Sequence, residues 1–207
     1  MSQLALIDGE PIITGSFPPT RTIGKEEVSA ATAVLESGEL SGFFGSWSDR
    51  FYGGPQVRQF EEEWADLFEV EHAVSFNSWT SGLIAAVGAS GISPGDEVIV
   101  SPWTMTASAA AILAWNAIPV FADINPETYN LCPESVVKTI TPRTKAIVMP
   151  LIFGSARGLI EVKKIAEENG LILIEDAAQT PYVRTEGSWA GTIGDIGGFS
   201  LNYHKHI

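Results

Sequence analysis

Hydroxyl side chains and backbone amides gather where the segment Asn77-Ser78-Trp79-Thr80-Ser81-Gly82 follows a short apolar run and opens a helix. The unpaired amides at a helix N-terminus, together with the hydroxyls of Ser78 and Thr80, are groups that bind an anion such as a phosphate. Serine is also an ordinary helix N-cap, so the segment taken alone favours a capping role.

Asp176 and Lys205 are the other residues whose type and position suggest chemistry. Asp176 follows the apolar run 171–175, and Lys205 comes five positions after Ser200. A carboxylate at the end of a strand can hold a protonated ring nitrogen, as the pyridinium of pyridoxal 5′-phosphate (PLP) requires. A lysine that loses its proton can attack an aldehyde. The alternatives are a capping aspartate and a solvated surface lysine, and for a lone lysine the surface position is the commoner one.

Other kinds of site find little support in the sequence. It contains no Gly-x-Ser-x-Gly elbow, no Walker loop and no His-Glu-x-x-His motif. The glycines of 187–198 follow no strand and open no helix, so they do not match a dinucleotide fingerprint. His72, His204 and His206 are too few and too scattered to predict a metal site, and we expect none.

The periodicity of apolar residues predicts strands that alternate with helices. Such alternation favours an α/β fold, a three-layer sandwich whose mainly parallel sheet is covered on both faces. The predicted helices are Lys25–Ser37, Gln56–Phe68, Trp79–Ser90, Thr104–Asn116, Pro133–Ile140 and Leu159–Asn169. The predicted strands are His72–Phe76, Glu97–Ser101, Ile118–Ala122, Lys145–Leu151, Leu171–Glu175 and Gly197–Leu201. Ligands of open α/β sheets bind beyond the carboxyl ends of the strands, which is where Asp176 and Lys205 would lie.

Length and charge narrow the class of protein. The 207 residues suffice for one α/β domain, and 25 acidic against 12 basic residues give a net charge of −13. An acidic chain repels nucleic acid, so that partner is not expected. Cys132 is the only cysteine, which excludes an internal disulfide. We expect a cytoplasmic protein without a membrane partner, because no signal peptide or long apolar run is present.

Taken in order, Asn-Ser-x-Thr, Glu-Asp-Ala-Ala-Gln and Phe-Ser-x-x-x-x-Lys resemble the DegT/DnrJ family of PLP-dependent sugar aminotransferases, which have fold type I. Further segments carry the same resemblance, among them 93–100, 119–124 and 141–147. It extends from about Ile23 to Ile207 and corresponds to the N-terminal half of family members. Residues 1–24, rich in Pro, Gly, Thr and Ser and without a clear period, are predicted to form an N-terminal arm. The resemblance implies a PLP-binding large domain at 25–207, incomplete at its end and lacking the C-terminal small domain. It also implies a homodimer.

The resemblance assigns roles by position. Lys205 corresponds to the catalytic Schiff-base lysine, and Asp176 to the partner of the pyridine nitrogen. Gln179 lies near the ring hydroxyl, while Ser78, Thr80 and Ser200 form the phosphate cradle. Two departures stand out: Trp79 replaces a glycine beside the phosphate, and Met105 replaces an aromatic residue over the ring.

Three functions follow as hypotheses. The first is amino transfer from an amino acid, expected to be L-glutamate, to a keto sugar, expected to be nucleotide-linked, in amino-sugar, polysaccharide or antibiotic biosynthesis. The second is a sugar dehydratase, in which relatives carry histidine in place of the lysine; the five-residue step from Ser200 reaches Lys205 rather than His204, which favours the aminotransferase. The third is a truncated, non-catalytic homologue that dimerises with a full-length protein.

Overall fold

The computed structural model describes residues 4, 6–7, 9–16 and 22–205, and it divides into two units, Met1–Gly42 and Phe43–Ile207. The first unit contains helix α1 (Lys25–Ser37), with the predicted bounds. Its N-terminus is capped by the Glu27 carboxylate, which accepts a hydrogen bond from the Gly24 amide at 2.6 Å. It ends at Gly38, whose φ of 70° is a conformation that glycine adopts without strain. The domain boundary expected at residue 24 stays a prediction.

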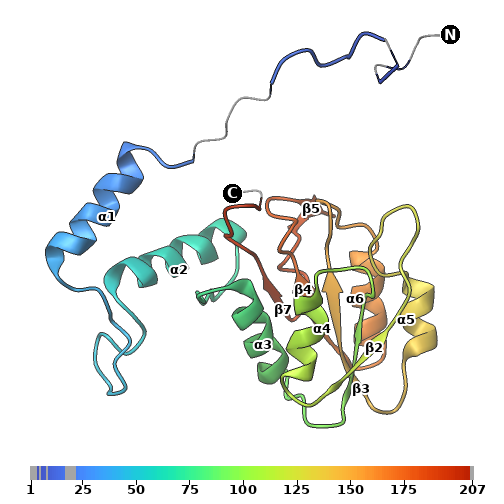
Figure 1. Ribbon diagram of the computed structural model, residues 1–207. Coiled ribbons are helices and arrows are strands. Elements are labelled where there is room, and N and C mark those ends of the chain that lie inside the picture. The colour runs from blue at the N-terminus through green and yellow to red at the C-terminus, as the bar shows by residue number, and fades with distance from the viewer. Residues whose placement is uncertain (1–3, 5, 8, 17–21, 206–207) are drawn as a thin grey trace. The chain divides into compact units, whose positions relative to one another are not determined.

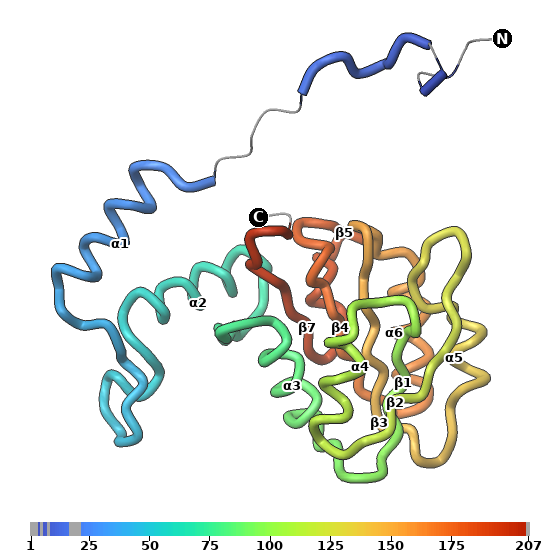
Figure 2. Tube along the Cα trace, viewed as in Figure 1, coloured from blue at the N-terminus to red at the C-terminus, as the bar shows by residue number. Residues whose placement is uncertain are grey.

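The second unit is built on a five-stranded sheet of order β2-β1-β3-β4-β7 (Figure 1). All its neighbouring strands pair in parallel, which confirms the predicted α/β class. The strands are β1 (Glu97–Val100), β2 (Ile118–Phe121), β3 (Thr144–Pro150), β4 (Ile172–Asp176) and β7 (Ile196–Gly198). The tube in Figure 2 shows β7, near the C-terminal end, lying beside β4.

Helices cover both faces of this sheet, as predicted. The helices of the second unit are α2 (Pro55–Phe68), α3 (Trp79–Ala89), α4 (Thr106–Leu113), α5 (Pro133–Thr139) and α6 (Leu159–Glu168). Side chains alternate along the strands: Val98 and Val100 pack with α3 and α4, whereas Ile99 packs in the cluster that contains α5 and α6. Both faces are therefore apolar, which explains the nearly continuous apolar runs in the sequence.

A short antiparallel hairpin joins β5 (Arg184–Thr185) to β6 (Ser188–Trp189), and the sequence did not predict it. Its turn residues Glu186 and Gly187 have φ values of 50° and 87°, as a type I′ turn requires. The Arg184 guanidinium lies 3.7 Å from the centre of the Trp189 ring. Two-residue strands are too short to show a period, so this element leaves little trace in the sequence.

Residues 72–76, predicted as a strand, are not one, and Val74 and Phe76 are largely exposed. The Ser75 amide and hydroxyl both donate to the Glu61 carboxylate of α2, at 2.6 and 2.8 Å. A side chain of a neighbouring helix thus takes the hydrogen bond that a sheet partner would take.

Helix α4 and strand β7 differ most from their predicted bounds, Thr104–Asn116 and Gly197–Leu201. Helix α4 begins at Thr106 and ends at Leu113. Strand β7 ends at Gly198 because Phe199 turns into an aromatic cluster, 4.5 Å from Phe68 between ring centres. Ser200 therefore follows the strand and is not part of it.

Candidate functional site

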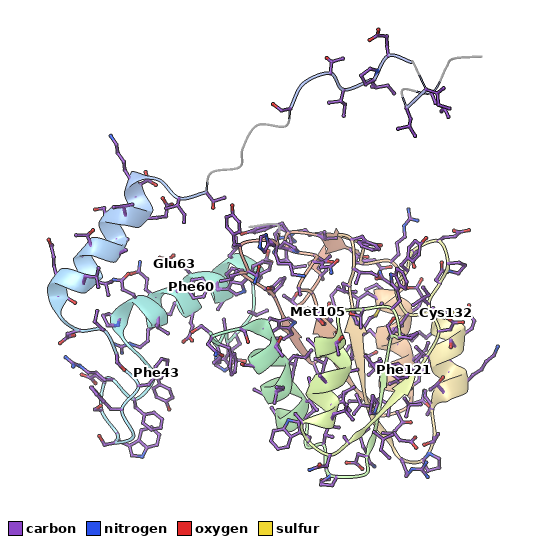
Figure 3. All side chains as sticks on the ribbon, viewed as in Figure 1. Phe43, Phe60, Glu63, Met105, Phe121 and Cys132 are labelled. Atoms are coloured by element: carbon purple, nitrogen blue, oxygen red, sulfur yellow. The ribbon has the colours of Figure 1, made fainter. Side chains whose placement is uncertain are left out.

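A cavity of about 930 Å³ opens beyond the carboxyl ends of β4 and β7 and beside the N-terminus of α3. All eight residues predicted for the site line it, although they come from four separate parts of the chain. They are Ser78, Trp79, Thr80, Met105, Asp176, Gln179, Ser200 and Lys205. In Figure 3 the label of Met105 marks the start of α4. The topology thus brings together residues that lie up to 127 positions apart in the sequence.

Asp176 is the most strongly held of these residues. It ends β4 and is only 7% exposed. Its Oδ1 accepts a hydrogen bond from Trp79 Nε1 at 2.7 Å, and its Oδ2 accepts one from Ser108 Oγ at 2.8 Å. The Ala178 amide donates to Oδ1 at 3.3 Å. A buried carboxylate is stabilised by such donors, and its orientation is fixed by them.

The N-terminus of α3 lies against the same cavity. Ser78 is its N-cap, and the Ser78 hydroxyl accepts a hydrogen bond from the Ser81 amide at 3.2 Å. The capping role weighed from the sequence is therefore confirmed. It does not compete with anion binding, because a capped helix still presents unpaired amides of its first turn. Ser78 and Thr80 are both exposed at the cavity.

Lys205 and Ser200 reach the cavity from the segment after β7. Both are half-buried, and the Lys205 backbone amide donates to the Asn202 carbonyl at 2.8 Å. Gln179 also lines the cavity, and its Oε1 accepts a hydrogen bond from the Phe153 amide at 3.1 Å. Met105 is 65% exposed, so its thioether is free of the core and borders the open cavity.

Glu175 of β4, for which the sequence predicts no role in the site, positions β7. Its fully buried carboxylate accepts hydrogen bonds from the amides of Gly191, Ile193 and Gly194 at 2.5–2.6 Å. Burial raises the pKa of Glu175 above the ordinary carboxyl range, against the lowering effect of these three amides. The bonds fasten the loop that enters β7, and β7 leads to Lys205.

Ser108 is a second residue that sequence reasoning missed. It is fully buried in α4 and contacts Asp176 directly. In the sequence, Ser108 can be recognised only as a polar residue in an alanine-rich predicted helix, four positions after Thr104. A small hydroxyl is common in such helices, so the sequence alone does not distinguish it from a neutral packing residue.

Two kinds of feature are absent from the described residues. Within 4, 6–7, 9–16 and 22–205, no group of three or more His, Cys, Asp or Glu side chains could hold a metal ion. Over that same part of the chain, no helix has the length and apolar character needed to cross a membrane.

The chain is similar to several known proteins. Spore coat polysaccharide biosynthesis protein SpsC of Bacillus subtilis (strain 168) is 40% identical over 185 residues, which are 89% of this chain and 45% of SpsC. L-Glutamine:2-deoxy-scyllo-inosose aminotransferase of Streptomyces kanamyceticus is 37% identical over 207 residues, 99% of this chain and 47% of the enzyme. The chain thus spans about half the length of the curated relatives that it matches.

Solved structures agree with the fold. The aminotransferase from Psychrobacter cryohalolentis has a TM-score of 0.83 and 32% identity, over 92% of this chain and 46% of that structure. E. coli GDP-4-keto-6-deoxy-D-mannose-3-dehydratase with bound hydrated PLP has a TM-score of 0.80 and 26% identity, over 91% and 47%. The architecture matches the large domain of fold-type I aminotransferases.

A model of the DegT/DnrJ/EryC1/StrS aminotransferase family matches residues 22–207. This chain belongs to that family.

Proposed function

We propose that this chain holds PLP at the cavity and that the whole protein transfers an amino group from an L-amino acid to the ketone of a sugar or cyclitol. The observation that carries the proposal is the convergence of Asp176, Lys205 and three hydroxyl side chains, those of Ser78, Thr80 and Ser200, on one cavity. Membership of the family supports it.

The residues present fit this cofactor. A cavity of about 930 Å³ lies within the roughly 300–1,000 Å³ of small-molecule sites. PLP needs an acceptor for its ring N–H, donors for its phosphate and an amine for its aldehyde. Asp176 is a buried acceptor, the start of α3 with Ser78, Thr80 and Ser200 offers donors, and Lys205 offers the amine.

In the proposed mechanism the residues of the cavity have separate tasks. Lys205 Nζ would bond to the aldehyde carbon of the cofactor. Once the donor's amine has replaced it there, the freed amine of Lys205 would take the proton from the donor α-carbon and return it at the former aldehyde carbon. Asp176 would accept the ring N–H, and Gln179 would be near the ring hydroxyl. The Met105 thioether would pack on the ring face, as a polarizable group can. When bound, PLP supplies an electron-accepting ring that stabilises negative charge at the donor α-carbon.

The names of two relatives support a proposal for the substrates. One relative is named for L-glutamine and the cyclitol ketone 2-deoxy-scyllo-inosose, and another for polysaccharide biosynthesis. We therefore propose L-glutamine or L-glutamate as donor, and a keto sugar or cyclitol ketone as acceptor, with or without a nucleotide. The proposal includes the homodimer that the resemblance implies and a cytoplasmic location.

A dehydratase is the second candidate, because one similar structure is a PLP-containing sugar dehydratase. Among the described residues, Lys205 lines the cavity, whereas the neighbouring His204 is exposed and does not. An amine at this position favours amino transfer.

An assay with and without an amino donor separates the two candidates. The protein is loaded with PLP and given 2-deoxy-scyllo-inosose or GDP-4-keto-6-deoxymannose, alone or with L-glutamine or L-glutamate. We expect the donor to change the cofactor's absorbance before any ketone is added, and an amine product to form only when the donor is present. Consumption of a ketone without a donor would contradict amino transfer and favour the dehydratase.

A further inference from the structure

Both oxygens of Asp176 are held by side chains from the two helices on one face of the sheet. Trp79 Nε1, from α3, donates to Oδ1 at 2.7 Å, and Ser108 Oγ, from α4, donates to Oδ2 at 2.8 Å. With the Ala178 amide at 3.3 Å, three donors use three of the roughly four acceptor positions of a carboxylate. About one acceptor position of the Asp176 carboxylate therefore stays available, and Asp176 lines the cavity.

The indole of Trp79 is seated in a slot that two glycines create. A Cβ on Gly198 would come within 1.9 Å of Trp79 Cζ3, and one on Gly82 within 2.8 Å of Trp79 Cε3. Gly198 lies on β7 and Gly82 lies on α3. Since no larger residue fits at Gly198 with the indole in place, the fold itself sets where Nε1 points.

Ser108 is also fixed in place, by burial and by a hydrogen bond with Thr104. It is fully buried, and its Oγ lies 3.1 Å from Thr104 Oγ1. A serine hydroxyl has one hydrogen. Because Ser108 gives that hydrogen to Asp176, Thr104 is the donor to Ser108. The resulting chain from Thr104 through Ser108 to Asp176 has one direction and fixes the rotation of the Ser108 hydroxyl.

We propose that Trp79 and Ser108 form a clamp on Asp176, which orients the carboxylate so that its remaining acceptor position meets the ring N–H of PLP. The clamp rests on the proposed function, because it is defined toward that cofactor. Trp79 and Ser108 are positioning residues: they act on the ring nitrogen through Asp176. Trp79, which departs from the family's glycine, thereby gains a role that the glycine lacks.

The test compares Trp79→Phe and Ser108→Ala with Trp115→Phe. Phenylalanine keeps an aromatic ring in the Trp79 slot, but it removes the N–H donor and part of the indole, and Trp115→Phe controls for the lost ring volume. Trp115 is a matched control: its Nε1 donates to the Ile84 carbonyl at 2.7 Å, and its ring lies 2.0 Å from where a Gly88 Cβ would be. It does not line the cavity.

Two measurements are made on each protein: the dissociation constant for PLP, and the ¹⁵N chemical shift of the ring nitrogen in ¹⁵N-labelled PLP. Losing one hydrogen bond to a charged group is expected to weaken PLP binding about tenfold, in Trp79→Phe and in Ser108→Ala. The ring-nitrogen shift should move toward the unprotonated value in both, whereas Trp115→Phe should match the parent. Equal or tighter PLP binding by Trp79→Phe would overturn the clamp, since the indole would then be a competitor of the cofactor.

The indole N–H resonance of Trp79, measured without PLP, separates failure of the clamp from failure of the proposed function. It should exchange slowly with solvent and shift in Asp176→Ala. If the parent protein binds no PLP, the proposed function fails and the clamp loses its cofactor role. If PLP binds but the Trp79 N–H exchanges as fast as an exposed indole, the clamp alone is refuted.

Discussion

Asp176→Asn is expected to slow the reaction of bound PLP with its amino donor by about 10³-fold, the cost of losing one preorganised electrostatic partner. The neutral amide cannot balance the positive charge of the ring nitrogen. It also presents an NH₂ group to one of the two side-chain donors that now meet the carboxylate, Trp79 Nε1 or Ser108 Oγ. The rate is measured by stopped-flow absorbance after mixing the PLP-loaded protein with L-glutamine.

The matched control for this substitution is Asp96→Asn. Asp96 is in a turn before β1, and its Oδ2 accepts a hydrogen bond from the Ser93 amide at 2.8 Å. Asparagine can accept the same bond, so the rate should stay at the parent value. A rate for Asp176→Asn within a few-fold of the parent would show that Asp176 does not face the ring nitrogen.

Glu175→Ala is expected to lower the free energy of unfolding by about 3 kcal/mol or more, because three backbone amides lose their acceptor and each unsatisfied buried donor costs roughly 1–3 kcal/mol. The amides belong to Gly191, Ile193 and Gly194. Urea unfolding followed by circular dichroism measures the change. Glu168→Ala removes an exposed carboxylate from α6 and should change the stability by less than about 1 kcal/mol.

The pH dependence of this effect has a definite sign. Burial raises the pKa of Glu175 above its ordinary value. A carboxyl group with a raised pKa in the folded state contributes most below its pKa in the unfolded chain. Its contribution falls as the pH rises through the folded-state pKa. The stability difference between the parent and Glu175→Ala should therefore be larger near pH 5 than near pH 8. A difference that grew with pH would mean that the three amides outweigh burial.

The pKa of Glu97, in β1 of the same sheet, is shifted in the opposite direction. Its hydrogen bond from Thr141, followed by the Arg143 guanidinium, lowers the pKa of its carboxyl group. The contribution of Glu97 is therefore present above its ordinary pKa and is lost as the pH falls.

Most of the sheet could be predicted because parallel strands are buried on both faces and read as apolar runs. The bounds of β1 to β4 lie within one or two residues of the prediction. The segment 72–76 shows where this reasoning fails. Its composition is that of a strand, yet its Ser75 amide bonds to Glu61 of α2, a contact between distant positions that no local pattern encodes. Phe199 ends β7 early for a similar reason, since its ring packs on Phe68.

The residues of the candidate site were predictable to the extent that they follow strand ends. Asp176 is of this kind, because the carboxyl ends of parallel strands meet at one edge of a sheet. The start of α3 was recognisable as a helix N-terminus, although the strand predicted before it is not present at 72–76. The supports of the site were not predictable. Glu175 accepts hydrogen bonds from residues that are 16–19 positions away in the sequence. Ser108 and Trp79 donate to Asp176, which is 68 and 97 positions away from them. Such contacts depend on the packing of α3 and α4 on the sheet.

Lys205 is the residue on which the account depends most, and chemical trapping tests it directly. The protein is incubated with PLP, reduced with borohydride and digested, and the peptides are mapped by mass spectrometry. We predict one reduced PLP group on Lys205, and none on this peptide in Lys205→Ala, while Lys164→Ala labels like the parent. Label on the other lysines only, with Lys205 unmodified, would contradict the assignment of the cofactor site.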